Sequence, residues 1–191
     1  MRISARRREL YDRLVNEHAA ELYRFAVRLC GRRDVAEDLL QETFYEAWKS
    51  ITSLRDPSRS RAWIYQILRH CYSHWRRKTS SRSQETVSLQ DWDASPAEIL
   101  EWGSPSLGEE EMLQKALERL HESYRETFLM VYLAGFTCQE AAQVLKIPLG
   151  TVLSRIHRAR MFLRQFLKSS FPQADTAKDR SRISTKKSAE S

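Results

Sequence analysis

The sequence is poor in the residues that interrupt helices, with only 5 glycines and 5 prolines among 191 residues. It also lacks any sustained alternation of apolar and polar residues, which is the pattern that a half-buried β-strand produces. These two absences argue against a β-sheet fold, because strands are usually bounded by glycine- and proline-rich turns. The sequence therefore predicts an all-α protein.

Long apolar runs and cysteine pairs are missing as well. No stretch approaches the roughly 20 apolar residues that a membrane-spanning helix needs, and the first residues, MRISARRREL, have no apolar segment behind their arginines. The cysteines Cys30, Cys71 and Cys138 are far apart and form no CxxC pair. This usage is typical of single buried thiols in a reducing compartment. We therefore expect a cytoplasmic protein that does not insert into a membrane.

Catalytic motifs are also missing from the sequence. It contains no glycine loop that could grip a phosphate, no nucleophile–base pair and no carboxylate–histidine cluster with metal spacing. His70 and His74 are four residues apart and could share a helix face, but no third metal ligand is near them. We expect no enzyme activity, no metal and no cofactor.

Acidic residues are absent from two basic stretches. The chain has 32 Lys and Arg against 25 Asp and Glu, a formal net charge of +7. From Arg55 to Arg82 the only acidic residue is Asp56, and from Lys146 to Lys168 there is none. Basic charge gathered in this way favours contact with nucleic-acid phosphates.

The second basic stretch reads as a helix-turn-helix over residues 137–167. Thr137 and Glu140 have the spacing of a capping box and predict a first helix over residues 139–146. Pro148 predicts a break before a second helix that starts near Thr151. Small alanines in the first helix would allow the second helix to cross closely. An ordinary solvated basic helix in a bundle is the alternative interpretation.

The second of these helices has a buried stripe and an outward face. The predicted stripe recurs at helical spacing and consists of Val152, Ile156, Ala159 and Leu163. The outward residues include arginines, whose planar fork matches the two acceptors on a guanine edge in the major groove. The candidate DNA-reading residues are Thr151, Ser154, Arg155 and Arg158.

The N-terminal part predicts helices over residues 9–30, 35–51 and 61–78. Gly31 would end the first and Asp34 would cap the second. The second helix has an acidic side, which is either a solvated surface or a docking surface for a basic partner. The third helix mixes basic and aromatic residues, as surfaces that bind single-stranded nucleic acid do.

The remaining segments divide the chain into two domains. Residues 79–108 turn acidic and rich in serine, glycine and proline, and are predicted to be a flexible linker. Helices are expected near 109–120 and 123–134, ahead of the helix-turn-helix. Residues 169–191 are polar and are predicted to be a disordered tail.

The order of these pieces resembles that of an extracytoplasmic-function sigma factor of the sigma-70 family, over roughly residues 9–167. DLLQETFYEAW (38–48) is similar to the core-polymerase-binding helix, and RAWIYQILRHCYSHWRRK (61–78) to the minus-ten recognition region. GTVLSRIHRAR (150–160) is the most specific part of the match to the minus-thirty-five recognition domain. The resemblance implies a region 2 domain over 1–78 and a region 4 domain over 109–168.

The resemblance also implies partners and roles. Asp38, Gln41 and Glu42 would bind core RNA polymerase, and Thr151, Ser154, Arg155 and Arg158 would read the minus-thirty-five element of promoter DNA. The implied minus-ten contacts are Arg61, Arg69, His70, Ser73, Arg76 and Arg77. The family further implies an anti-sigma factor, anchored in the membrane, and control of stress or resistance genes.

Three residues depart from the family pattern, and one other function stays open. His70, His74 and Leu153 stand where asparagine, aspartate and lysine are frequent, which affects the promoter sequence that would be read. The alternative function is a helix-turn-helix regulator that is not a polymerase subunit. For the sigma factor, we expect an inhibitor helix between the two domains, against apolar surface around Trp48, Trp63 and Phe128.

Overall fold

The structure is a computed structural model that describes residues 2–79 and 107–170. Every regular element in these ranges is a helix, which confirms the predicted all-α class. Most of the predicted linker and tail lies outside the described residues. That includes the linker's acidic residues, Glu85, Asp91, Asp93, Glu98 and Glu101. None of the helices in the two described ranges is both long and apolar enough to span a bilayer.

The first group of helices comprises α1 (Arg2–Cys30), α2 (Arg33–Ser50) and α3 (Ser60–Thr79). Two 3₁₀ turns, η1 (Ile51–Ser53) and η2 (Pro57–Arg59), connect α2 to α3. Helix α1 begins well before the predicted Glu9. Its extra turns are held by Arg7, which donates a hydrogen bond to the Trp48 carbonyl and lies 4.6 Å from the centroid of the Trp48 ring.

The predicted cap of α2 at Asp34 is wrong. Arg32 is the N-cap residue, with extended backbone and no side-chain capping hydrogen bond, and Asp34 lies within the first turn. There its carboxylate pairs with Arg32. That pair lowers the pKa of Asp34, and a negative charge in the first turn also suits the positive end of the helix dipole. Asp34 therefore favours the start of α2 by charge instead of by capping.

The second group comprises α4 (Leu107–Arg119), α5 (Glu122–Tyr132), α6 (Cys138–Leu145) and α7 (Leu149–Ser170). Helices α4, α5 and α6 all contact α7. Helix α7 begins two residues before the predicted Thr151 because the Pro148 carbonyl already accepts hydrogen bonds from the Thr151 and Val152 amides, at 3.0 and 3.2 Å. The proline ends one helix and leads into the next.

The predicted helix-turn-helix is confirmed, and so is the capping box at the start of its first helix. The Glu140 amide donates to the Thr137 hydroxyl at 3.2 Å, and the Thr137 amide donates to the Glu140 carboxylate at 2.8 Å. Lys146 then ends α6 in the left-handed conformation, with φ of 55°. The predicted stripe of α7, Val152, Ile156, Ala159 and Leu163, is buried. Local hydrogen bonds and a buried seam thus fix the angle between α6 and α7.

We expect Thr137→Ala to destabilise the second group by about 1 kcal/mol, because it leaves an amide at the start of α6 without its acceptor. Thr137→Ser should retain nearly full stability, because serine can cap in the same way. Urea unfolding followed by circular dichroism measures both variants. Equal midpoints for alanine and serine would contradict a contribution from the capping hydroxyl.

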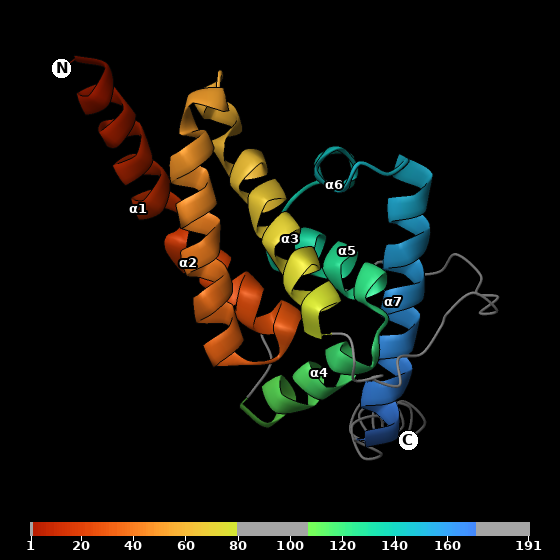
Figure 1. Ribbon diagram of the computed structural model, residues 1–191. Coiled ribbons are helices and arrows are strands. Elements are labelled where there is room, and N and C mark those ends of the chain that lie inside the picture. The colour runs from red at the N-terminus through yellow and green to blue at the C-terminus, as the bar shows by residue number, and fades with distance from the viewer. Residues whose placement is uncertain (1, 80–106, 171–191) are drawn as a thin grey trace, which may run out of the picture.

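The two groups pack directly against each other. Helix α3 contacts α6, and α1 contacts α4 and α5, so that one face of the first group is covered by the second (Figure 1). The core is continuous across this boundary: the Tyr65 ring meets Phe25 and Phe136 edge-on, with centroids 5.1 and 5.0 Å away. The described helices therefore share one hydrophobic core.

The predicted apolar surface around Phe128 is exposed at the neighbours of Phe128, since Tyr132 and Leu133 are 38% and 41% exposed, but Phe128 itself is not. Phe128 is buried and its ring stacks on Tyr132 with centroids 4.6 Å apart, because the second group uses it for its own packing. Trp63 is half-buried, whereas Trp48 remains 37% exposed. Of the three named residues only Trp48 is itself exposed, and near Phe128 the open apolar surface belongs to Tyr132 and Leu133.

Candidate nucleic-acid interface

The outward face of α7 carries the predicted DNA-reading residues at the start of the helix. Ser154 is exposed, and Thr151, Arg155 and Arg158 are half-buried. Arg155 borders the core stripe, because it lies one turn before the buried Ala159, and its charge acts to lower the pKa of the buried Glu126. The Ser154 hydroxyl donates to the Thr151 carbonyl at 3.1 Å. All four residues lie on a single helical surface that is anchored by buried neighbours, as residues that enter a groove must be.

Two leucines that were not predicted as site residues flank this surface. Leu149 and Leu153 are 44% and 50% exposed, at positions one turn apart on α7. Their apolar side chains lie beside polar ones that suit base edges. An apolar side chain on such a surface can contact a thymine methyl group.

The acidic side of α2 is open to solvent. Asp38, Gln41 and Glu42 are all exposed and lie on one face, because they are three and four residues apart along the helix. Tyr45 shares that face and is 58% exposed. Sequence reasoning missed Tyr45, although its spacing from Gln41 and Glu42 could have identified it. The result is a polar surface with one aromatic side chain, suited to a protein partner.

Helix α3 divides the six predicted minus-ten residues between two environments. Arg61, Arg69 and Arg76 face the second group of helices and are half-buried. His70 and Arg77 are exposed and Ser73 is half-buried. The predicted set therefore does not form a single open surface in this structure.

Each of the three inward arginines has a named partner. Arg61 pairs with Glu21 at 3.2 Å and also donates to the Ala134 carbonyl. The Arg69 Nε atom lies 3.0 Å from Glu126 Oε1. The third pair joins Arg76 Nε to Glu122 Oε2 at 3.4 Å. Three positive charges that were predicted to meet DNA are therefore engaged within the protein.

Glu126 is the most buried of these carboxylates. Burial raises the pKa of Glu126, and the positive charge of Arg69 opposes that rise. A buried carboxylate is costly unless it is paired, so the contact with Arg69 is needed for Glu126 to stay charged. The charge of Glu126 in α5 therefore depends on how close α3 holds Arg69 to it.

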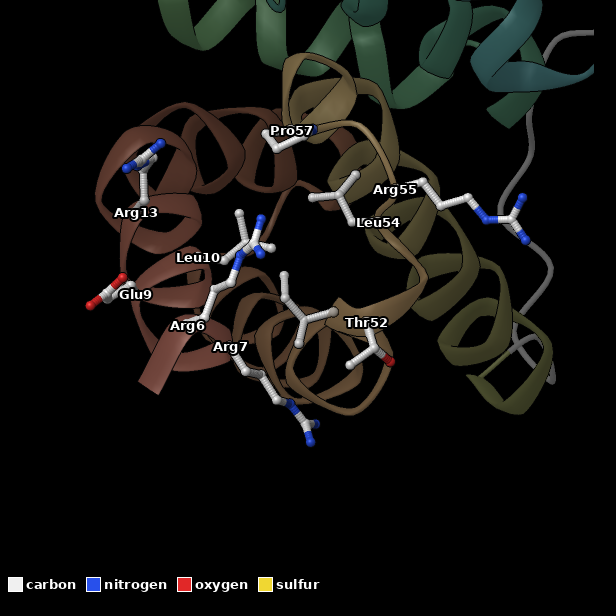
Figure 2. A pocket seen from close by; sticks show the side chains of 10 residues that line it. Arg6, Arg7, Glu9, Leu10, Arg13, Thr52, Leu54, Arg55 and Pro57 are labelled. Carbon is white, nitrogen blue, oxygen red and sulfur yellow. The ribbon is translucent and has the colours of Figure 1, made fainter. Parts of the chain in front are cut away.

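A basic hollow that the sequence did not predict lies between the start of α1 and the turns after α2. Its lining includes the apolar residues Leu10, Ile51 and Leu54 and the basic residues Arg6, Arg13 and Arg55. Figure 2 shows the Arg6 side chain extending toward Leu10. Its volume is about 600 Å³. The hollow could not be predicted from the sequence, because the two segments that form it are about 40 residues apart and meet only after folding. It extends the positive surface of the first group.

The described side chains include neither a group of potential metal ligands nor a disulfide. Residues 5–79 and 110–169, whose side chains are described, contain no cluster of three or more His, Cys, Asp or Glu side chains that could hold an ion. The three cysteines are free thiols. Cys71 is buried as predicted, but Cys30 and Cys138 are only half-buried, because they lie at helix ends.

Two family models match the chain, one in each half. Sigma-70 region 2 matches residues 14–82, and Sigma-70, region 4 matches residues 110–163. The first range contains the acidic face of α2 and the basic helix α3. The second contains the helix-turn-helix.

Known proteins resemble the chain over most of its length. The ECF RNA polymerase sigma factor SigE of Mycolicibacterium smegmatis is 34% identical over 82% of this chain, which spans 61% of that protein. SigL of Mycobacterium tuberculosis is 34% identical, covering 82% of this chain and 86% of the relative. EcfG of Rhodopseudomonas palustris is 35% identical over 75% of this chain and 77% of its own length.

A solved sigma factor structure is also similar to this chain over most of its length. The sigma factor RpoE of Bartonella quintana, in complex with the anti-sigma factor NepR, aligns with a TM-score of 0.64 and 29% identity. The alignment covers 83% of this chain and 96% of that one. Both halves and their order are thus shared with characterised sigma factors. The chain belongs to the extracytoplasmic-function (ECF) sigma factors of the sigma-70 family.

Proposed function

We propose that this protein binds core RNA polymerase and directs initiation at a specific set of promoters. The observation that carries this proposal is the presence, in one chain, of an open acidic face on α2 and a helix-turn-helix, each inside a matched sigma region. Sigma factors are initiation factors and not enzymes, so no catalytic site is required. A regulator outside the polymerase would leave the acidic face of α2 without a role.

Residues 1–78 form the proposed polymerase-binding and promoter-melting domain, and residues 109–168 form the minus-thirty-five domain. Residues 79–108 would be the linker between them and 169–191 would be the tail, with the last residue of α3, the first two of α4 and the last two of α7 inside these bounds. Asp38, Gln41 and Glu42 would contact the coiled coil of the largest polymerase subunit. Their exposure supports this role, because a docking surface has to be accessible in the free protein.

Promoter DNA would be read at two places. Thr151, Ser154, Arg155 and Arg158 would enter the major groove at the minus-thirty-five element, from a helix held by its buried stripe. At the melted minus-ten element, Arg61, Arg69, His70, Ser73, Arg76 and Arg77 would follow the separated strand. His70 and Arg77 are open for this contact in the structure, whereas three of the arginines must first exchange their protein partners.

An anti-sigma factor is the proposed regulator, and the protein would act in the cytoplasm. The complex of RpoE with NepR supports this type of partner for a similar chain. Membrane anchoring of the inhibitor would connect it to signals from outside the cell, such as envelope stress. An inhibitor that covers Asp38, Gln41 and Glu42 would block polymerase directly.

The function is tested by mixing the labelled chain with core RNA polymerase and separating the products by gel filtration. We expect the label to elute with the polymerase, and excess unlabelled chain to displace it. Competition by an unrelated sigma factor should do the same, because sigma factors share the docking site. A label that elutes alone at micromolar concentrations of both proteins would contradict the proposed function.

Replacing Arg155 or Arg158 by alanine should weaken binding to a minus-thirty-five duplex by roughly 1–3 kcal/mol, if the arginine makes a bidentate contact to guanine. Fluorescence anisotropy with promoter and scrambled duplexes measures the effect. Gln165→Ala is a suitable control, because Gln165 is exposed on the same helix but far from its start. Equal losses on both duplexes would show that the arginines contact phosphates only, and unchanged binding would remove them from the interface.

A further inference from the structure

Two exposed leucines lie among the basic residues of α7. Leu149 and Leu153 are 44% and 50% exposed, and neither belongs to the hydrophobic core or to the partly buried residues packed against it. The buried side of α7 is already formed by its own stripe, which includes Val152 and Ile156. Within the described ranges, the packing of the protein therefore gives these two leucines no role.

The two leucines lie beside the residues proposed to read DNA. They are four residues apart, so both lie on one side of the helix, about 6 Å apart along its axis. Leu153 directly precedes the exposed Ser154, within the first turns of α7. Residues near the start of a recognition helix are the ones that reach base edges. A helix that brings Ser154 into the major groove therefore brings the leucines with it.

The surface between the leucines is open as well. Gly150 follows Leu149, and a Cβ atom added there would meet no described heavy atom within 4 Å, apart from its chain neighbours and the helix backbone around it. Its φ lies outside the left-handed region, unlike the φ of Gly31 and Gly135, which are 74° and 69°. Neither packing among the described residues nor backbone conformation requires glycine at this position. Such a glycine suits a place where the backbone of a partner comes close.

The charge of α7 indicates which kind of partner the leucines meet. The helix contains five basic residues and no acidic one: Arg155, Arg158, Arg160, Arg164 and Lys168. Duplex DNA offers phosphates to such a helix on both sides of its major groove. The groove also contains one apolar group, the C5-methyl of thymine. DNA with thymines therefore satisfies the basic and the apolar side chains together, which an apolar protein segment would not.

We propose that Leu149 and Leu153 contact the methyl groups of two thymines in the minus-thirty-five element and so determine part of the promoter sequence, an inference that rests on the proposed function. Leucine has no hydrogen-bonding group, so a cytosine at the same place would lose water from its amino group without gaining a partner. Leu153 stands where lysine is frequent in the family, and lysine favours the acceptors of guanine. The leucine therefore favours thymine over guanine at its position. A separation of about 6 Å corresponds to about two base steps of roughly 3.4 Å.

The preferred sequences are identified first. Core RNA polymerase, alone or as the holoenzyme with the wild-type chain, selects duplexes from a random-sequence pool. We expect the holoenzyme to enrich an upstream element with two thymines within about two base steps of each other. Enrichment identical to that of the core alone would contradict the proposed function, and the thymine contacts with it. An enriched upstream element without such thymines would contradict the thymine contacts alone.

Replacing each of these thymines by deoxyuridine removes the methyl group and leaves the hydrogen-bonding edge of the base unchanged. Fluorescence anisotropy with the holoenzyme and labelled duplexes measures the affinity. Each replacement should weaken binding about fourfold, as expected when the burial of about one CH₂-sized group is lost. Affinities that do not change with deoxyuridine would overturn the proposal. If Leu149→Ala and Leu153→Ala then also weaken assembly with core polymerase, the leucines belong to a protein interface instead.

Variants of the leucines connect the methyl effect to the protein. Leu149→Ala and Leu153→Ala should each make the holoenzyme insensitive to one of the two replacements, because the contact to that methyl group is already lost. Leu153→Met keeps an apolar side chain and should retain the effect. The matched control is Leu133→Ala, which changes a 41% exposed leucine at the end of α5 and should leave both effects intact. Methyl effects that persist at full size in both α7 alanine variants would overturn the proposal.

Discussion

Replacing Arg125 by alanine is expected to lower the free energy of unfolding by roughly 3 kcal/mol, a large effect for one residue. The side chain makes three hydrogen bonds to carbonyl oxygens, of Leu29, Glu118 and Leu120. Alanine would leave those buried acceptors without a donor and create a cavity between α1, α4 and α5. Burial lowers the pKa of Arg125, so part of the gain from its hydrogen bonds is offset by the cost of desolvating the charge.

Arg125→Lys separates charge from geometry. Lysine keeps the positive charge near the ends of α1 and α4 but cannot reach three carbonyls with a planar fork. Its stability in urea unfolding should therefore lie between those of the wild type and the alanine variant. A loss below about 1 kcal/mol for alanine would contradict the view that this residue ties the two groups together.

Charge reversal at Asp38 is expected to weaken binding to core polymerase about ten- to hundredfold, which corresponds to about 1.4–2.8 kcal/mol. Asp38 is exposed at the middle of the acidic face of α2, so its replacement by arginine should leave folding intact while opposing a basic partner surface. The affinity is measured by fluorescence anisotropy with labelled protein and purified core enzyme.

Two further variants show whether the effect of Asp38→Arg is specific to the acidic face of α2. Asp12→Arg makes the same charge change at an exposed position of α1 and should bind polymerase as the wild type does. Tyr45→Ala removes the aromatic side chain on the same face and should also weaken binding, because exposed tyrosines often anchor interfaces. Equal affinities for Asp38→Arg and Asp12→Arg would place the docking surface elsewhere.

Local rules explain which parts of the fold could be predicted from sequence. The capping box at Thr137, the break at Pro148 and the stripe from Val152 to Leu163 depend on residues within a few turns of one another. These three features could therefore be predicted from the sequence alone. The prediction that Asp34 caps α2 was wrong because the Asp34 carboxylate accepts a hydrogen bond from Arg32 instead. The spacing of residues in the sequence does not reveal which of these two contacts forms.

The contacts between the halves could not be predicted in this way. Arg125 binds a carbonyl 96 residues away, and Arg69 meets a carboxylate 57 residues away. In sequence, Arg61, Arg69 and Arg76 look like the exposed arginines of a nucleic-acid surface, and only packing turns them toward Ala134, Glu126 and Glu122. The acidic face of α2 was predictable because its residues are neighbours on one helix, and none of the segments that the structure describes covers them.

Run-off transcription with purified components tests the central claim most directly. Core RNA polymerase alone, the core with this protein, and the core with the Asp38→Arg variant are supplied with linear genomic fragments from the source organism. We predict discrete transcripts only when the wild-type protein is present, and strongly reduced amounts with the variant. Transcript patterns that are identical with and without the protein, when an established sigma factor is active on the same core enzyme, would contradict its assignment as a promoter-specific polymerase subunit.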